Sequence, residues 1–133
     1  MNVNDLMVSV RVPFRYGVSS GVLAGSAAAS IPLTLDAGSS FELHRIVGTS
    51  NADSEANITP NNFTVLISQI NGQQWSSLPV PQECICPQVE EGGWWFRIPV
   101  LLPPRFQMTF AFADLGAGGT HLVELVGFML KGQ

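Results

Sequence analysis

Apolar and polar residues alternate along most of the chain, which is the pattern of β-strands that bury one face. The alternation is clearest in FQMTFAFAD, where Phe106, Met108, Phe110 and Phe112 share one side of the predicted strand. Shorter runs of the same kind predict strands at residues 8–15, 31–35, 41–47, 63–68, 73–77 and 94–98, and a last strand at 120–130. No stretch of about 11 residues or more has the spacing of an amphipathic helix. The sequence therefore predicts an all-β fold, an antiparallel β-sandwich of jelly-roll type with about eight strands.

One domain is expected, because 133 residues fall within the usual size of a single folding unit. Residues 1–29 are expected to supply an N-terminal strand and could continue as an extended arm. The reason is that SSGVLAGSAAAS, at residues 19–30, is small and featureless, so it could form a loop, an arm or a short strand around Val22 to Ala24. Residues 30–133 are expected to form the β-sandwich.

The first strand is predicted to bury the side that carries Val8, Val10, Val12 and Phe14. Pro13 cannot donate a hydrogen bond to a neighbouring strand, so this strand should lie at a sheet edge or end near the proline. In an assembly, the N-terminal segment could then act as an arm toward neighbouring subunits.

The strand at 41–47 shows a similar alternation. In an unbroken strand, Arg45 would share a face with Phe41 and Leu43, while Ile46 would face the other way. The prediction therefore places Arg45 beside core positions and Ile46 away from them.

The last strand, THLVELVGFML, is apolar on both faces. One face holds His121, Val123, Leu125 and Met129, and the other holds Leu122, Val126, Phe128 and Leu130. Such a strand is buried on both sides, or one of its sides meets another subunit. Gly127 inside it predicts a bulge or a point where another backbone approaches closely.

Three turn and loop signals punctuate the strands. Asn71-Gly72 predicts a β-hairpin, with a short strand pairing back over residues 73–77. The polar segment at 48–62 is the longest predicted loop. GAGGT at residues 116–120 resembles a phosphate-binding loop, but no helix follows it, so a hairpin turn is expected instead.

The composition is poor in charge, and this changes the expected surface. Charged residues make up 12% of the chain, whereas about 25% is usual. A surface with so few charges is expected to be largely covered by partners. The alternative is an ordinary domain whose exposed surface is rich in Ser, Thr, Asn and Gln.

Charge and hydropathy also argue against several classes of protein. The net charge is −4 and the six basic residues are scattered, so nucleic-acid binding is not expected. No apolar run is long enough to span a membrane, so a membrane association is not expected either. The start of the chain lacks the pattern of a secretory signal, which predicts synthesis and use in a cytoplasm. Two cysteines fit such a reducing compartment.

Candidate catalytic and metal-binding groups are sparse. Cys84-Ile85-Cys86 could contribute to a metal site, but one chain offers too few further ligands, so two unligated thiols are the preferred interpretation. Neither His44 nor His121 belongs to a nucleophile or zinc motif. A pair of carboxylates such as Glu42 and Glu124 could serve a glycosidase, but nothing in the sequence selects one pair. We therefore expect no enzyme activity, metal or cofactor.

The aromatic pair Trp94-Trp95 gives the strongest indication of a binding surface. In a strand, Trp94, Phe96 and Ile98 would share one face, and Trp95 and Arg97 the other, so the two indoles cannot form one platform. Tryptophan and arginine are enriched at the energetic centres of protein interfaces. Trp95 could instead stack on a sugar or be partly buried filler. The residues expected at a protein interface are Trp95, Arg97, Trp75, Phe128 and Leu130.

Several stretches resemble a known group of proteins. They are SFELHRIVGTS, NFTVLISQINGQQWSSLPVP and FRIPVLLPPRFQMTFAFADLGAGGTHLVELVGFMLKG, which together cover roughly residues 30–132. Their order of strands and turns is similar to that of the small jelly-roll accessory proteins that cement or decorate the capsids of tailed bacteriophages.

This resemblance implies a non-enzymatic virion protein that stabilises a shell by bridging neighbouring capsid subunits. Its partners would be the major capsid protein or other virion proteins. The protein would be a homo-oligomer, a dimer or trimer, found in the virion after assembly in the host bacterial cytoplasm. Related sandwiches occur elsewhere in phage particles. The alternative is therefore a carbohydrate-binding or receptor-binding module of a tail or fibre, which Trp95, Trp75 and the loop at 48–62 would suit.

Overall fold

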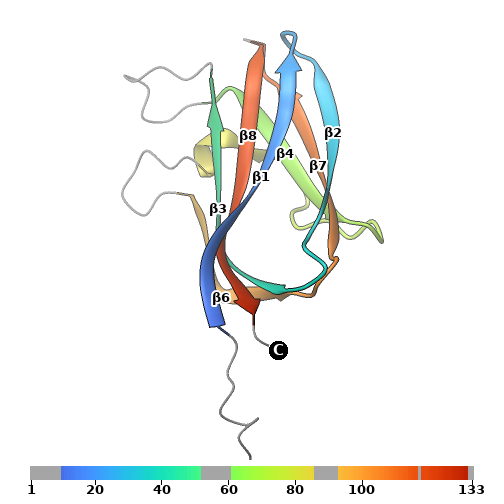
Figure 1. The fold of residues 1–133 in the computed structure, drawn as a ribbon. Coiled ribbons are helices and arrows are strands. Elements are labelled where there is room, and N and C mark those ends of the chain that lie inside the picture. The colour runs from blue at the N-terminus through green and yellow to red at the C-terminus, as the bar shows by residue number, and fades with distance from the viewer. Residues whose placement is uncertain (1–9, 52–60, 86–92, 117, 132–133) are drawn as a thin grey trace, which may run out of the picture.

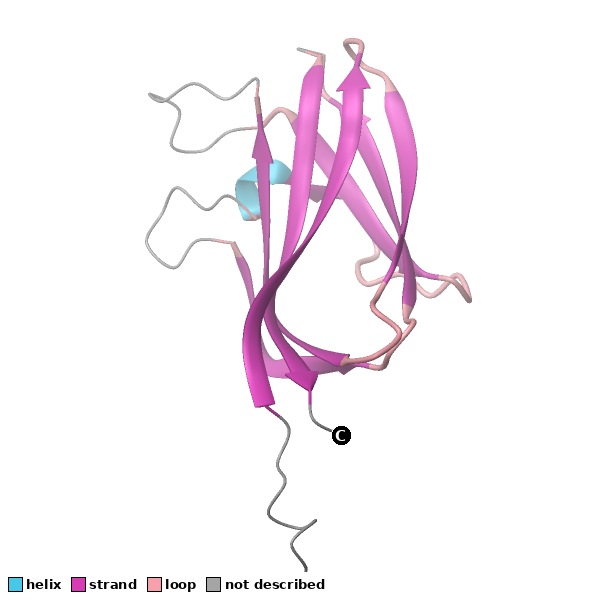
Figure 2. Ribbon diagram, in the orientation of Figure 1, coloured by secondary structure: helices cyan, strands magenta, loops and turns pink. Residues whose placement is uncertain are grey.

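The computed structural model of the chain describes residues 10–51, 61–85, 93–116 and 118–131. They form two four-stranded antiparallel sheets packed face to face (Figure 1). The strands are β1 (Val10–Leu23), β2 (Ala28–Thr34), β3 (Ser40–Ser50), β4 (Phe63–Gln69), β5 (Val80–Pro81), β6 (Trp94–Leu102), β7 (Gln107–Asp114) and β8 (Gly119–Lys131). A short 3₁₀ helix, η2 (Gln82–Cys84), follows β5 (Figure 2). The predicted all-β sandwich is confirmed.

Within the described ranges, no helix has the length and apolar character needed to cross a membrane.

The order of the strands defines the topology. One sheet runs β1-β8-β3-β6 and the other runs β2-β7-β4-β5. Apart from the β4–β5 hairpin, each connection along the chain crosses from one sheet to the other. This interleaving is the jelly-roll arrangement, as predicted. It also corrects one expectation, because the glycine-rich segment after Asp114 joins β7 to β8 in opposite sheets and is therefore a corner and not a hairpin turn.

The core lies between the two sheets and follows the alternation seen in the sequence. Phe110 and Phe112 on β7 and Phe63 on β4 are buried against Phe41 and Leu125 of the facing sheet. Burying an apolar side chain of this size stabilises a fold by about 1.5–3 kcal/mol. The packed aromatic layer therefore joins the two sheets.

Prolines mark all four sheet edges. The edge strands β1, β2, β5 and β6 contain Pro13, Pro32, Pro81 and Pro99, respectively, while the four inner strands contain none. Because proline has no backbone N–H, it weakens an edge as a template for a further strand. The predicted edge position of the first strand is confirmed, and addition of a partner strand is disfavoured at each edge.

The segment at 19–30 is more regular than a loop or an arm. β1 continues through it to Leu23, with a bulge between Ser19 and Val22, and β2 begins at Ala28. β1 pairs with β8 over most of its length, so residues 10–23 are part of the sandwich. Residues 1–9, which include Val8, lie outside the described residues.

The first half of β1 is more exposed than predicted. Val10, Val12 and Phe14 are 60%, 36% and 38% exposed, so the expected buried face is wrong there. Burial on this face begins with the partly buried Tyr16 and the buried Val18. The facing edge strand β2 has 7 residues against 14 in β1, which is too short to cover both halves.

The turn predicted at Asn71-Gly72 is present, but residues 73–77 do not form the strand expected to pair back, and β4 pairs with β5 instead. Gly72 has φ +88°, which favours glycine, and its N–H donates to the carbonyl of Gln69 at 2.9 Å. After the turn, the chain makes only an isolated bridge between Ser68 and Gln74. The segment at 73–77 therefore remains a loop that is held against the end of β4.

Candidate protein-binding face

A bulge in β3 shapes the outer face of the β1-β8-β3-β6 sheet. The register between β3 and β8 shifts between Leu43 and Arg45, which makes His44 an extra residue in the strand. Beyond the bulge, Ile46 is buried in the core and Arg45 lies on the outer face. The predicted positions of Arg45 and Ile46 were thus interchanged, because the alternation assumed an unbroken strand.

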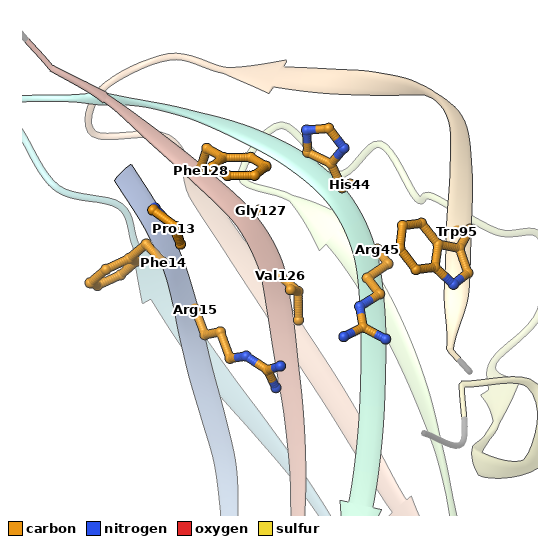
Figure 3. Close-up of a pocket in the computed structure, with 9 residues that line it drawn as sticks. All are labelled: Pro13, Phe14, Arg15, His44, Arg45, Trp95, Val126, Gly127 and Phe128. Atoms are coloured by element: carbon orange, nitrogen blue, oxygen red, sulfur yellow. The ribbon is translucent and has the colours of Figure 1, made fainter. Parts of the chain in front are cut away.

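A shallow hollow of about 580 Å³ lies on this outer face (Figure 3). Four strands contribute to its lining, which consists of Pro13, Phe14, Arg15, His44, Arg45, Trp95, Val126, Gly127 and Phe128. The lining combines aromatic and aliphatic surface with two arginines. None of the described acidic side chains lines it.

Trp95 forms one wall of the outer-face hollow. Its side chain is 49% exposed, and the Arg45 guanidinium lies 5.0 Å from the centre of its ring system. This cation–π contact is attractive, and it restricts the orientation of both the guanidinium and the indole ring. Trp94 points the other way and stacks on Phe96, with ring centres 5.4 Å apart. The two tryptophans therefore lie on opposite faces of β6, as predicted.

The alternation along β6 is interrupted at Ile98 and continues with the partly buried Val100 and the buried Leu102. Ile98, predicted to share the inner face of Trp94, is 81% exposed. The pairing of β6 with β3 is interrupted between Trp95 and Val100, and the intervening residues include Pro99. Ile98 lies in this unpaired part of β6, which accounts for its exposure.

Phe128 forms another wall and is held by polar neighbours. The Arg11 guanidinium lies 4.2 Å from its ring centre, and the His44 ring meets it edge-on at 5.2 Å. Glu42 joins these two groups, because Oε1 is 2.7 Å from Arg11 and 2.5 Å from His44 Nε2. The hydrogen bond from His44 lowers the pKa of Glu42 against the opposing effect of burial, and Arg11 adds to the lowering.

The structure brings together only some of the residues predicted at an interface. Trp95 and Phe128 line the same hollow. Leu130 lies two residues beyond Phe128 on β8 and is partly buried, and Arg97 is exposed on β6. Trp75 does not belong to this hollow. It is partly buried and faces Phe96 on the inner side of β6, with ring centres 6.3 Å apart.

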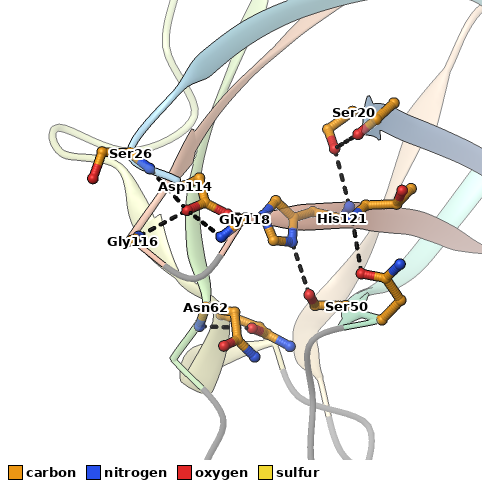
Figure 4. Close-up of polar contacts among 12 residues, drawn as sticks. Ser20, Ser26, Ser50, Asn62, Asp114, Gly116, Gly118 and His121 are labelled. Carbon is orange, nitrogen blue, oxygen red and sulfur yellow. Dashed lines mark hydrogen bonds and ion pairs between the residues drawn. The ribbon is translucent and has the colours of Figure 1, made fainter. Parts of the chain in front are cut away.

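A polar cluster that motif searching missed lies at the other end of β8. Asp114 Oδ1 accepts hydrogen bonds from the backbone N–H groups of Ser26 (3.0 Å), Gly116 (2.7 Å) and Gly118 (2.9 Å) (Figure 4). Oδ2 lies 2.6 Å from His121 Nε2. Burial alone would raise the pKa of Asp114, but these four hydrogen bonds outweigh it and hold the pKa well below its usual range. The N–H groups of the glycine-rich corner thus bind a carboxylate of the chain itself.

His121 extends this cluster to other strands. Its ring is buried and stacks on Phe63, with centres 4.7 Å apart, and Nδ1 lies 2.9 Å from Ser50 Oγ. Its backbone N–H donates to Ser20 Oγ at 3.0 Å. An ionised carboxylate only accepts hydrogen bonds, so the His121 Nε2–H group donates a hydrogen bond to Asp114 Oδ2.

Ser50, His121 and Asp114 form a hydrogen-bonded chain of the same residue types as a Ser–His–Asp relay, but the ring nitrogens are exchanged, with Nε2 facing Asp114 and Nδ1 facing Ser50. The residues are far apart in sequence and belong to no nucleophile motif, so only the fold brings them together. None of them lines the outer-face hollow, and neither His121 nor Asp114 has an exposed side chain. We interpret the cluster as a structural hydrogen-bond network that holds the ends of β1, β3, β7 and β8 together.

The other candidate groups take ordinary positions. Cys84 is exposed with a free thiol, while Cys86 lies outside the described residues. Among residues 10–51, 61–85, 93–116 and 118–131, His, Cys, Asp and Glu side chains form no group of three or more that could hold a metal ion. Glu124 pairs with Arg15 at 3.3 Å on the outer face, so Glu42 and Glu124 both lie in ion pairs.

No protein-family model, curated protein or solved structure matches this chain. The jelly roll is the fold that the resemblance to phage accessory proteins implied, but fold alone does not define function. Function is therefore inferred from the geometry of the surfaces.

Proposed function

We propose that the protein is a non-enzymatic structural component of a phage virion, a cement or decoration protein that bridges neighbouring capsid subunits. The outer-face hollow carries this proposal. Trp95 stands half-exposed beside Arg45, and Phe128 lies across the same hollow. Exposed tryptophan with arginine and a neighbouring phenylalanine is the composition of an interface centre.

The sheet edges support docking on a face. Each edge strand carries a proline, so a partner gains little by adding a strand there. The outer face instead offers a broad four-stranded surface. Contact over a standard interface of about 1,600 Å² would be enough for specific binding.

Exposed apolar side chains are spread over other parts of the surface as well. Among the described residues outside the hollow, large exposed ones include Val10, Val12, Ile70, Leu78, Ile98, Leu101 and Leu115. Together with a charged fraction of only 12%, they support a protein with more than one partner surface. This fits a homo-oligomer, a dimer or trimer, that also contacts the major capsid protein or other virion proteins.

Replacing Trp95 by glutamate is expected to weaken binding to capsid shells at least about 30-fold, the effect of losing an interface centre worth about 2 kcal/mol or more. The shells are assembled from the major capsid protein encoded in the same genome. Co-sedimentation of shells with increasing protein measures the binding.

Val22→Glu is the matched control, because Val22 is 87% exposed and lies eight residues along β1 from Phe14, about 26 Å away. It introduces the same charge on an apolar surface position and should bind like the wild type. The proposal would be rejected if wild-type protein failed to bind shells at micromolar concentration. Binding to isolated tails or fibres and not to shells would favour a tail or fibre module.

A further inference from the structure

A second hollow, of about 410 Å³, opens beside Trp75 at the inner side of β6. Aromatic rings and amides dominate its lining, which includes Trp75, Trp94, Phe96, Gln69, Gln73 and Gln74. The remaining lining residues that the structure describes are apolar, and none of them is charged. Its volume falls within the range of small-molecule sites, about 300–1,000 Å³. We propose that this hollow binds a neutral saccharide.

The aromatic rings form two walls of different orientation. Trp94 and Phe96 are stacked, with 21° between their planes, and Trp75 stands at 87° to Phe96 with ring centres 6.3 Å apart. All three are partly buried and packed against the core, so little ordering is needed when a ligand binds. The faces of aromatic rings carry partial negative charge, which attracts the C–H groups of a sugar ring.

The turn after β4 supplies the polar side chains that line the hollow. The Gln69 N–H donates to the carbonyl of Gln73 at 2.8 Å, and the Gln73 N–H donates to Asn71 Oδ1 at 3.0 Å. These bonds fix the backbone that carries Gln69, Gln73 and Gln74. A glutamine amide both donates and accepts hydrogen bonds, as does a sugar hydroxyl.

The neutrality of the lining selects among ligands. A phosphate, an acidic sugar or a metal ion would find no opposite charge among the described lining residues. An apolar peptide would cover the amides without replacing their hydrogen bonds to water, which costs binding energy. A neutral saccharide satisfies the amides and the rings together.

The irregular path of β6 creates this site. The residues between Trp95 and Val100 leave the register with β3, and Phe96 lies in this displaced segment, where it meets Trp75. Bulges often aim side chains at functional sites in this way. The sequence had offered both Trp95 and Trp75 for sugar binding; Trp75 lines this hollow, whereas Trp95 lies on the opposite face of the sheet. The proposed saccharide site and the outer-face hollow therefore lie on different surfaces. Either proposal can fail without the other.

The test uses ¹⁵N-labelled protein and NMR titration with glucose, galactose, mannose, N-acetylglucosamine, cellobiose and lactose. At least one sugar is expected to shift the side-chain amides of Gln73 and Gln74 and the indole N–H of Trp75. Because the hollow is open and shallow, we expect dissociation constants of about 0.1–10 mM. para-Cresol serves as an apolar probe.

The double variant Gln73→Ala with Gln74→Ala changes two exposed side chains and should fold normally. It is expected to weaken sugar binding at least about fivefold, because two hydrogen bonds are lost. Trp75→Ala should abolish binding, and Trp95→Ala should leave it unchanged. Absence of any shift at about 50 mM sugar, unchanged affinity in the double variant, loss of binding in Trp95→Ala, or binding of para-cresol alone would each overturn the proposal.

Discussion

Replacing Asp114 by alanine is expected to lower the free energy of unfolding by about 3–5 kcal/mol, because several hydrogen-bond donors in a buried site lose their acceptor and each such loss costs about 1–3 kcal/mol. Asp114 accepts hydrogen bonds from three backbone N–H groups and from the His121 imidazole. Alanine would leave these donors without their acceptor in a buried site. Urea denaturation of the variant and the wild type measures the difference.

Glu124→Gln is the control for loss of a carboxylate. Glu124 pairs with Arg15 at the surface, where the arginine side chain is 53% exposed. Pairs of this kind contribute about 0–1 kcal/mol, so the control should remain close to the wild type. A loss in Asp114→Ala no larger than that in Glu124→Gln would show that the cluster does not hold the four strand ends together.

Acid should reveal the same carboxylate through the pH dependence of stability. The folded-state pKa of Asp114 lies below its value in the unfolded chain, about 3.9. The unfolded state therefore binds more protons in acid. The contribution of Asp114 is fully present above about pH 5 and decreases as the pH falls below about 4 toward the folded-state pKa.

Asp114→Asn keeps the side-chain shape but cannot ionise, so its free energy of unfolding should fall less steeply between about pH 4 and pH 2 than that of the wild type. Denaturation series at fixed ionic strength measure both slopes. Equal slopes would mean that other carboxylates determine the acid sensitivity and that Asp114 is not the main titrating group.

The strand content and most of the core could be predicted from sequence, because each depends on a period of two within one strand. Phe106, Met108, Phe110 and Phe112 face inward on and beside β7, with Phe106 only partly buried. The opposite orientation of Trp94 and Trp95 follows from the same rule. These features need no knowledge of which strands become neighbours.

Predictions failed where a second strand decides the outcome. The bulge at His44 exists only in relation to the register of β8, and it moves Arg45 and Ile46 to faces that the alternation did not give them. The exposure of Val10 depends in a similar way on the length of β2, which lies in the other sheet. Single-strand periodicity contains no information about such partners.

The two hollows and the Asp114 cluster show the same limit. Trp95 could be selected as a surface residue from sequence, but its neighbours Arg45 and Phe128 come from other strands. Ser50 and Asp114 are 64 positions apart, and His121 joins them only because β3, β7 and β8 end near one another. The one available signal was the polar His121 among the apolar positions of the last strand.

Gly127→Ala is expected to destabilise the fold by about 3 kcal/mol or more, at the upper end of the cost of overpacking. A Cβ atom at Gly127 would lie only 1.9 Å from the backbone carbonyl oxygen of Glu42 and 3.2 Å from the Cα of Leu43. Backbone atoms cannot rotate away as a flexible side chain can. β3 and β8, two inner strands of one sheet, would have to separate at this point.

Gly17→Ala provides the matched control, because Gly17 also lies in a paired strand, opposite Glu124. A Cβ atom there would meet only the Leu122 Cδ1 atom at 3.6 Å, an ordinary contact. Since alanine is favoured over glycine in a strand by about 0.5–1 kcal/mol, this variant should be as stable as the wild type or slightly more stable. The comparison separates the close approach of β3 from the general effect of replacing glycine. If both variants unfold at the same urea concentration, the backbone of β3 does not approach Gly127 as closely as the structure shows. The bulge that places Arg45 beside Trp95 would then lose its structural basis.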